Sequence, residues 1–307
     1  MYIPLDRDVT CVLSGLTVAL VTATAIGQTL RRQAIASDGP RVTIDNLNAR
    51  ILSWWVMCGV MLAALLLGPI ALAVLFGLLS MGALREFVTL TQTRRADHRP
   101  LLLAFFVAIP AQYALVASGS DHLFAVLIPV YGLVCLGAAV AIAGDTVRFV
   151  ERLSTIVLGV MVCVYGLSYA PALSAKLLLF LVLVVESSDV LQYIWGKLCG
   201  RRALAPRVSP SKTVEGLIGG VATVTLLGAV LWRLTPFNPW QAALLAFAAA
   251  MMGFLGGLVM SAVKRDRGVK DFGTAIAGHG GILDRVDSLC FAAPVFFHLA
   301  RYWTSVS

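Results

Sequence analysis

Long apolar runs dominate this chain and alternate with short polar segments. Each run has roughly 17–25 residues, the length that a helix needs to cross about 30 Å of hydrocarbon. Because that layer holds no water, each run has to satisfy its own backbone hydrogen bonds, which favours helices over strands. We therefore predict an all-α, polytopic transmembrane protein. About ten spans are expected, at residues 9–29, 51–68, 69–84, 101–118, 123–143, 153–172, 175–195, 214–232, 239–262 and 287–304.

The composition agrees with this interpretation. Hydrophobic residues make up 59% of the 307 residues and charged residues 13%, whereas a soluble domain carries roughly 25% charged residues. The six cysteines are scattered and lie mostly inside apolar runs, where a thiol behaves as a small hydrophobe. We therefore expect neither a disulfide framework nor a zinc site.

The lysines and arginines predict the orientation in the membrane. Twenty of the 24 follow the odd-numbered spans, and the other side holds only Arg7, Lys176, Arg233 and Arg301. By the positive-inside rule the side with twenty is cytoplasmic, and both termini lie outside. The net charge of +8 thus indicates topology, and we expect no nucleic-acid partner.

The chain divides into two regions of one membrane domain. Residues 1–185 are a transmembrane region without a recognisable motif, and residues 186–307 carry the polar loops that could hold chemistry. We expect the second region to be catalytic.

The richest of these loops is the segment 261–287. It holds five cations, four carboxylates, a histidine and five glycines in 27 residues. Glycine lets backbone amides approach a phosphate or adopt positive φ. Asp284 and Asp287 would share one face of a helix, and Mg²⁺ binds to one or two carboxylates together with substrate phosphates. The spacing alone also fits a solvated, charged loop that leads into an Asp-rich helix start.

A second polar block covers residues 186–216. Ser211 or Thr213 could cap the following helix, whose amino terminus attracts phosphate, and Lys212 would add a full charge. Alone, this pattern also fits an ordinary capped helix. Glu186 and Asp189 lie at the end of an apolar span, where an acid costs about 2.5–3.5 kcal/mol, so they are functional candidates unless they reach the interface.

These two blocks together resemble the phosphatidate cytidylyltransferases (CDP-diacylglycerol synthases). The family signature combines Ser-x-x-Lys-Arg, Lys-Asp, His-Gly-Gly and Asp-Arg-x-Asp. Those elements stand here as Ser261 with Lys264-Arg265, Lys270-Asp271, His279-Gly280-Gly281 and Asp284-Arg285-Val286-Asp287. The run Ser209-Pro-Ser-Lys-Thr-Val-Glu-Gly216 is similar to the family's other marked loop. Ala277 and Gln192 depart from the residues usual in the family, and the resemblance covers about residues 186–288.

The resemblance implies the reaction of CTP with phosphatidate, or a similar lipid phosphate, to give CDP-diacylglycerol and pyrophosphate. It implies catalytic roles for Asp271, Lys270, Asp284, Arg285 and His279. Substrate binding is implied for Ser209, Ser211, Lys212, Thr213, Ser261, Lys264, Arg265, Gly280, Gly281 and Asp189. One or two cations, with Mg²⁺ among them, would be held by Asp271, Asp284, Asp287 and Asp189.

The expected setting is a bacterial inner membrane, with the active-site loops in the cytoplasm, where CTP is found. Membrane lipid is the expected surrounding, and whether two copies pair as a homodimer stays open. A transporter would instead show charged, broken helices in several spans and an internal repeat. A CDP-alcohol phosphotransferase would continue Asp284-x-x-Asp287 with glycine and further aspartates, but Ser288 follows and no later aspartate exists. A related membrane nucleotidyltransferase or lipid kinase acting on another lipid phosphate or alcohol remains an alternative.

Overall fold

A computed structural model of the chain describes residues 6–36, 42–91, 93–276 and 280–306. Over these ranges the protein is a helical bundle with one two-stranded hairpin, and every predicted span falls on a helix. The first helices are α1 (Arg7–Ala36), α2 (Val42–Leu67) and α3 (Pro69–Thr89). Next come η1 (Arg95–Asp97), α4 (His98–Leu103), η2 (Ala104–Ala108), α5 (Ile109–Ser118), α6 (Asp121–Val126), η3 (Leu127–Gly132), α7 (Leu133–Ile142), α8 (Phe149–Val160) and η4 (Met161–Gly166). The last part contains α9 (Ala175–Cys199), β1 (Ala203–Ala205), β2 (Ser209–Thr213), α10 (Val214–Val230), η5 (Leu231–Leu234), α11 (Pro239–Asp266) and α12 (Leu283–Val306).

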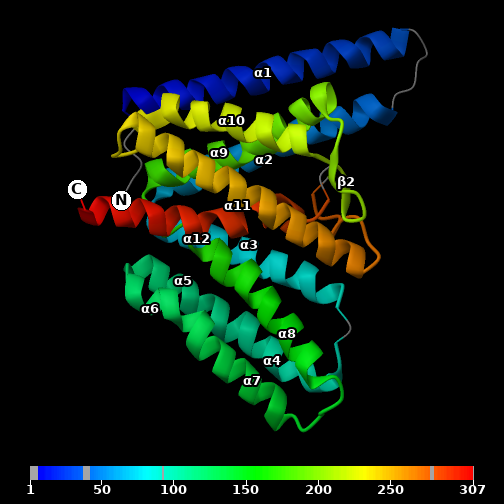
Figure 1. The fold of residues 1–307 in the computed structure, drawn as a ribbon, viewed down its shortest axis with the longest axis vertical. Helices are drawn as coiled ribbons and strands as arrows, with labels where there is room; N and C mark the ends of the chain where they lie inside the picture. Colours follow the sequence, from blue (N-terminus) through cyan, green and yellow to red (C-terminus); the bar gives the residue numbers. More distant parts are fainter. Residues whose placement is uncertain (1–5, 37–41, 92, 277–279, 307) are drawn as a thin grey trace.

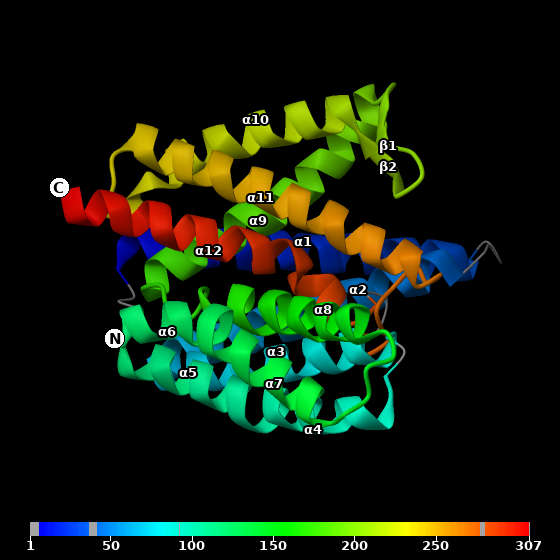
Figure 2. The ribbon, with the colours of Figure 1, turned by 60° about the horizontal axis from the view of Figure 1, so that its bottom comes forward.

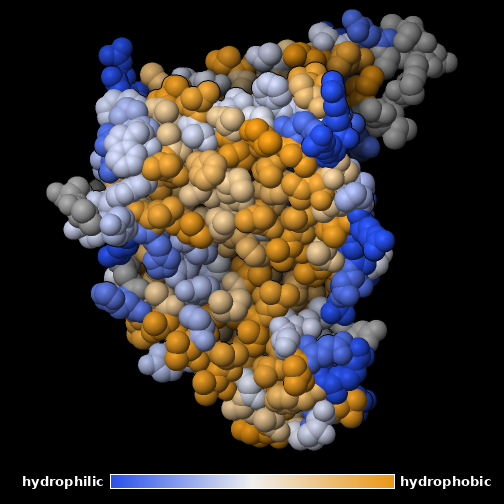
Figure 3. Space-filling model, viewed as in Figure 1, coloured by the Kyte–Doolittle hydropathy of each residue, from blue (hydrophilic) through white to orange (hydrophobic). Residues whose placement is uncertain are grey.

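Nine helices within the described ranges are long and apolar enough to cross a membrane. The tenth predicted span corresponds to α12, a 24-residue helix that begins with Leu283, Asp284 and Arg285. A broad apolar surface lies between two polar ends of the molecule (Figure 3). The protein is therefore an all-α, polytopic membrane protein.

The helices form two groups on either side of α12. Helices α3 to α8 gather on one side, and α9, α10 and α11 lie on the other (Figures 1 and 2). Both ends of the described chain lie at one polar end of the bundle, and the hairpin lies at the opposite end. An even number of passes gives this arrangement.

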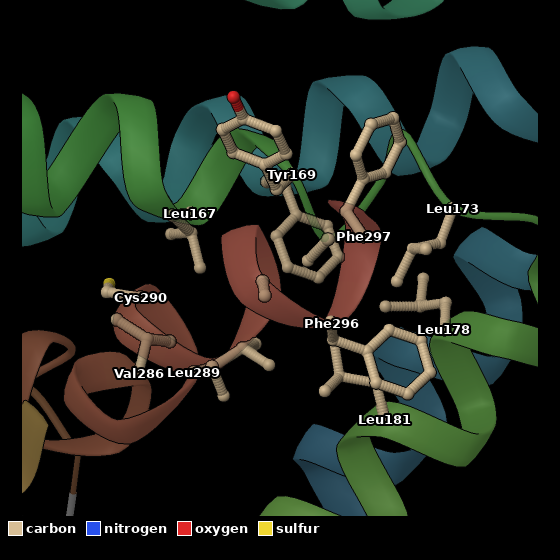
Figure 4. Packing of buried hydrophobic residues seen from close by; sticks show 14 of the residues in the cluster. Leu167, Tyr169, Leu173, Leu178, Leu181, Val286, Leu289, Cys290, Phe296 and Phe297 are labelled. Carbon is tan, nitrogen blue, oxygen red and sulfur yellow. The ribbon is translucent and has the colours of Figure 1, made fainter. Parts of the chain in front are cut away.

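Helix α12 packs through the middle of the core. Phe296 and Tyr169 are fully buried and Phe297 is nearly so, and the Tyr169 ring lies 5.2 Å from that of Phe297 (Figure 4). In a membrane such packing, rather than transfer out of water, holds helices together. The packing fixes α12, and with it the polar first turn that begins at Leu283.

Two local features differ from the sequence prediction. The sixth span is shorter than predicted, because its helical segments end at Gly166 and a turn containing Pro171 follows. The loop before α10 contains the antiparallel hairpin, in which Ala203 pairs with Thr213 and Ala205 with Ser209. The Val208 amide donates to the Ala205 carbonyl at 3.1 Å, so Pro206 occupies the second position of a β-turn, which it favours.

Which polar end faces the cytoplasm stays a prediction from the charge distribution. In a background with the native cysteines replaced by serine, Ser211→Cys at the hairpin end should resist an impermeant thiol reagent added to intact cells. Ser305→Cys, which is exposed at the opposite end, should be labelled. The reverse labelling pattern would show that the orientation is inverted.

Candidate active site

Four helix ends and the hairpin enclose a cavity of about 290 Å³ at the polar end opposite the termini. Helices α9 and α11 end there, and α10 and α12 begin there (Figure 1). Ten residues that the sequence predicts as functional line the cavity: Asp189, Ser211, Lys212, Thr213, Ser261, Lys264, Asp271, Asp284, Arg285 and Asp287. Two motifs that are about 70 residues apart in the chain therefore form one site.

Asp284 is held by three donors. Its Oδ1 accepts from the Lys264 ammonium at 2.9 Å, and its Oδ2 accepts from the amides of Phe272 at 2.8 Å and Gly281 at 2.9 Å. The side chain of Asp284 is 4% exposed and that of Lys264 13%. Removing one partner of an ion pair this deeply buried strongly destabilises the fold, because the other charge stays buried without a counter-charge. Asp284 thus ties the end of α11 and the following loop to the first turn of α12.

Asp189 and Asp287 converge on the hydroxyl group of Ser288. This hydroxyl lies 3.0 Å from Oδ2 of Asp189 and 3.4 Å from Oδ1 of Asp287. The two carboxylates come from α9 and α12 and both line the cavity. Like charges this close repel each other, so the arrangement favours a cation or a proton between them.

Lys212 enters the cavity from β2. Its Nζ lies 4.6 Å from the centre of the Phe254 ring and 3.4 Å from the Phe254 carbonyl oxygen. A Cβ at Gly257 would come within 2.9 Å of that Nζ, so a side chain there would shift the ammonium from this position. Burial lowers the pKa of the Lys212 ammonium, while the carboxylates of Asp189 and Asp287 act in the opposite direction.

The cavity lining also includes the cap of α10 and a buried guanidinium nitrogen. The Thr213 hydroxyl caps α10 by accepting from the Gly216 amide at 3.1 Å, which confirms one of the two predicted caps. Arg285 lines the cavity, and its buried Nε has no hydrogen-bond partner among the residues described. A buried guanidinium nitrogen without an acceptor is costly unless a ligand supplies one.

Five predicted residues lie outside the cavity lining: Ser209, Arg265, Lys270, Gly280 and Gly281. Arg265 is exposed and donates to the carbonyls of Val208 at 3.2 Å and Val269 at 3.0 Å, so it ties α11 to the hairpin. Lys270 is exposed. Gly280 has the expected positive φ, 81°, and Gly281 contributes the amide that binds Asp284. His279 and Ala277 lie outside the described residues.

Sequence reasoning missed several residues in or beside the site. Phe254, Gly257 and Ser288 line the cavity, but each belongs to an apolar helix where small and aromatic residues are common. Glu86 of α3 accepts the amides of Ile282 and Leu283, both at 2.9 Å. The only sequence signal for Glu86 was an acid near the end of an apolar run, the same signal that singled out Glu186 and Asp189.

Among the described residues, no group of three or more His, Cys, Asp or Glu side chains is arranged to hold a metal ion. The pair of Asp189 and Asp287 nevertheless matches what Mg²⁺ takes from a protein, since this ion keeps several waters and completes its octahedron with substrate phosphates. The donor set therefore fits a cation that is shared with a phosphate-bearing substrate.

A sequence profile of the cytidylyltransferase family matches residues 48–303. The chain belongs to the cytidylyltransferase family. It is therefore a membrane-bound nucleotidyltransferase, and the match extends far into the region for which the sequence offered no motif.

Several curated proteins are similar to this cytidylyltransferase-family chain. The uncharacterized protein YnbB of Escherichia coli K12 is 40% identical over 94% of this chain and 97% of its own length. A phosphatidate cytidylyltransferase of Bacillus subtilis is 28% identical over 83% of this chain and 97% of its own length. A phosphatidate cytidylyltransferase of Staphylococcus saprophyticus is 43% identical over 38% of this chain and 46% of its own length.

Proposed function

We propose that this enzyme transfers CMP from CTP to phosphatidate, or a similar lipid phosphate, and releases CDP-diacylglycerol and pyrophosphate. The observation that carries the proposal is the cavity, in which Lys212, Arg285 and the Asp189–Asp287 pair meet at a polar end of a membrane bundle. The names of the relatives support the same reaction. We expect a nucleotide to enter this cavity from water and a lipid headgroup to reach it from the leaflet.

In the proposed reaction, an oxygen of the lipid phosphate attacks the α-phosphorus of CTP. A new phosphorus–oxygen bond forms, the bond from the α-phosphorus to the bridging oxygen breaks, and pyrophosphate leaves with the electron pair. Such transfers ask little covalent chemistry of the protein, so positioning and charge neutralisation provide most of the catalysis. Lys212 and Arg285, whose Nε has no hydrogen-bond partner among the residues described, are the cations best placed to neutralise phosphate oxygens.

Asp189 and Asp287 would hold Mg²⁺, with the exposed Asp271 as a further carboxylate at the cavity wall. A bound cation would neutralise the nucleotide phosphates and orient them. Both oxygens of Asp284 already accept hydrogen bonds. We therefore assign Asp284 to organising the loop around the site, and Asp189 and Asp287 to the cation.

Lys212 and Gln192 should affect different substrates. Lys212 lies on β2, just before α10, and would face the phosphates, whereas Gln192 lies on α9 and donates to the Ser188 hydroxyl at 2.6 Å. Loss of a charge-assisted phosphate contact costs about 1.5–3 kcal/mol, or roughly 10- to 150-fold. Lys212→Ala should therefore lower kcat/KM for CTP by that factor with little change in lipid preference. Gln192→Ala should alter acceptor preference more than CTP dependence.

Steady-state kinetics would measure both effects. CTP would be varied in one series, and two lipid phosphates that differ in structure near the phosphate would be compared in the other. Equal shifts of nucleotide and lipid kinetics in both variants would contradict the division of roles.

Purified protein incubated with CTP, magnesium and phosphatidate tests the proposed function. Mass spectrometry should find CDP-diacylglycerol, and an enzymatic assay should find an equal amount of pyrophosphate. Diacylglycerol in place of phosphatidate should give no product. A phosphorylated lipid formed from diacylglycerol, without a liponucleotide from phosphatidate, would instead identify a lipid kinase.

A further inference from the structure

Glu86 joins the amino-terminal half of the chain to the start of α12. Its Oε1 accepts from the Ile282 amide and its Oε2 from the Leu283 amide, both at 2.9 Å. The first amides of a helix have no partner within the helix and lie at the positive end of its dipole. A carboxylate that accepts two of them is a strong, oriented contact. Glu86 and Ile282, which this contact joins, are 196 positions apart in the sequence.

The loop around Glu86 is shaped to admit this carboxylate. A Cβ at Gly273 would lie 2.6 Å from Oε1 of Glu86, and a Cβ at Gly281 would collide with its Oε2. The neighbouring Phe87 packs near Phe272, with ring centroids 6.4 Å apart. A side chain at either glycine would displace the Glu86 carboxylate or the loop from this position, so the two glycines leave room for the acid.

This contact lies next to the residues that we assign to the site. Asp284 follows directly on Leu283, and it accepts from the amides of Gly281 and Phe272. Asp287 follows one turn later on the same helix. Glu86 is not part of the cavity lining, so it reaches the cavity only through the residues that it holds.

We propose that Glu86 is a positioning residue, which fixes the first turn of α12 so that Asp284 and Asp287 face the cavity. The expected effect of Glu86 on turnover rests on the proposed function. Its effect on the first turn of α12 does not. The proposal also predicts where phosphate does not bind. Because Glu86 and Asp284 occupy the amides of Gly281, Ile282 and Leu283, substrate phosphates are directed to Lys212 and Arg285.

Glu86→Gln and Glu86→Asp test this, with Arg85→Gln as the matched control on the exposed neighbour. The amide of Gln turns an N–H toward one of the two backbone donors, so one hydrogen bond is lost. Loss of an outer residue that orients a metal site costs about 10- to 100-fold. We expect kcat of Glu86→Gln to fall by that factor, KM for CTP to change little, and the magnesium concentration for half-maximal rate to rise. Glu86→Asp keeps both oxygens on a shorter side chain and should be intermediate.

Hydrogen exchange provides a measurement that does not depend on the reaction. In Glu86→Gln, the amides of Ile282 and Leu283 should exchange faster while the interior of α12 keeps its protection and Tm stays near that of Arg85→Gln. Unchanged protection at these two amides would overturn the proposal. Lost protection along all of α12, with kcat falling only in proportion to the folded fraction, would also overturn it. A wild-type enzyme inactive on phosphatidate would refute the proposed function, yet the exchange result would still decide the role of Glu86.

Discussion

Asp287→Asn is expected to lower kcat by about 10²–10³-fold, the scale for removing one preorganised electrostatic group from an active site. The variant should fold as well as the wild type in the absence of magnesium. The reason is that Asp287 and Asp189 both approach the Ser288 hydroxyl, at 3.4 and 3.0 Å, and neutralising one carboxylate relieves their repulsion. The substitution should therefore lower activity without lowering stability.

Thermal unfolding with and without magnesium and CTP measures the separation. A ligand that binds only the folded state raises Tm, so the wild type should gain stability from magnesium with CTP and Asp287→Asn should gain much less. Asp266→Asn is the control, because the side chain of Asp266 is 69% exposed and pairs with the adjacent Arg267. Wild-type turnover of Asp287→Asn at saturating magnesium would remove Asp287 from the cation site.

Asp284→Asn should instead lose both turnover and stability. Its carboxylate forms a buried ion pair with Lys264 at 2.9 Å, and removing one partner of such a pair costs about 3–5 kcal/mol because the other charge stays buried. Asn keeps an acceptor for the backbone amides but leaves the ammonium without a counter-charge. Chemical denaturation and initial rates should both show the loss.

A double variant separates the two effects. Lys264→Met combined with Asp284→Asn removes both charges, and the free energy of unfolding should recover much of the loss, as a double-mutant cycle detects for residues in contact. Turnover should stay low, because the loop is no longer tied to α12 by an ion pair. A single Asp284→Asn variant with wild-type stability would show that the ion pair contributes little.

The fold was largely predictable because membrane crossing imposes a local rule. Each span must be apolar and long enough by itself, so the ten runs could be located without knowledge of their neighbours. The hairpin at Ala203–Thr213 was missed because short strands between polar residues give a weak pattern, although Pro206 signals the turn.

The site was predictable only as two local motifs. Sequence spacing places Asp284 and Asp287 on one helix, and the family resemblance implied that Lys212 and Asp189 act with them. Neither the spacing nor the resemblance could show that Arg265 contacts the hairpin, since an arginine is long enough to reach either the cavity or the hairpin. Glu86 escaped notice because its partners are about 196 positions away and contribute backbone amides, which leave no trace in side-chain composition.

The fate of labelled phosphate tests the central claim most directly. Purified protein is given phosphatidate, magnesium and CTP labelled at either the α- or the γ-phosphorus, and lipid is then extracted into organic solvent. CMP transfer predicts that the α-label enters the lipid and that the γ-label stays in water as pyrophosphate. The γ-label in the lipid, or neither label in the lipid with folded enzyme, would contradict the account.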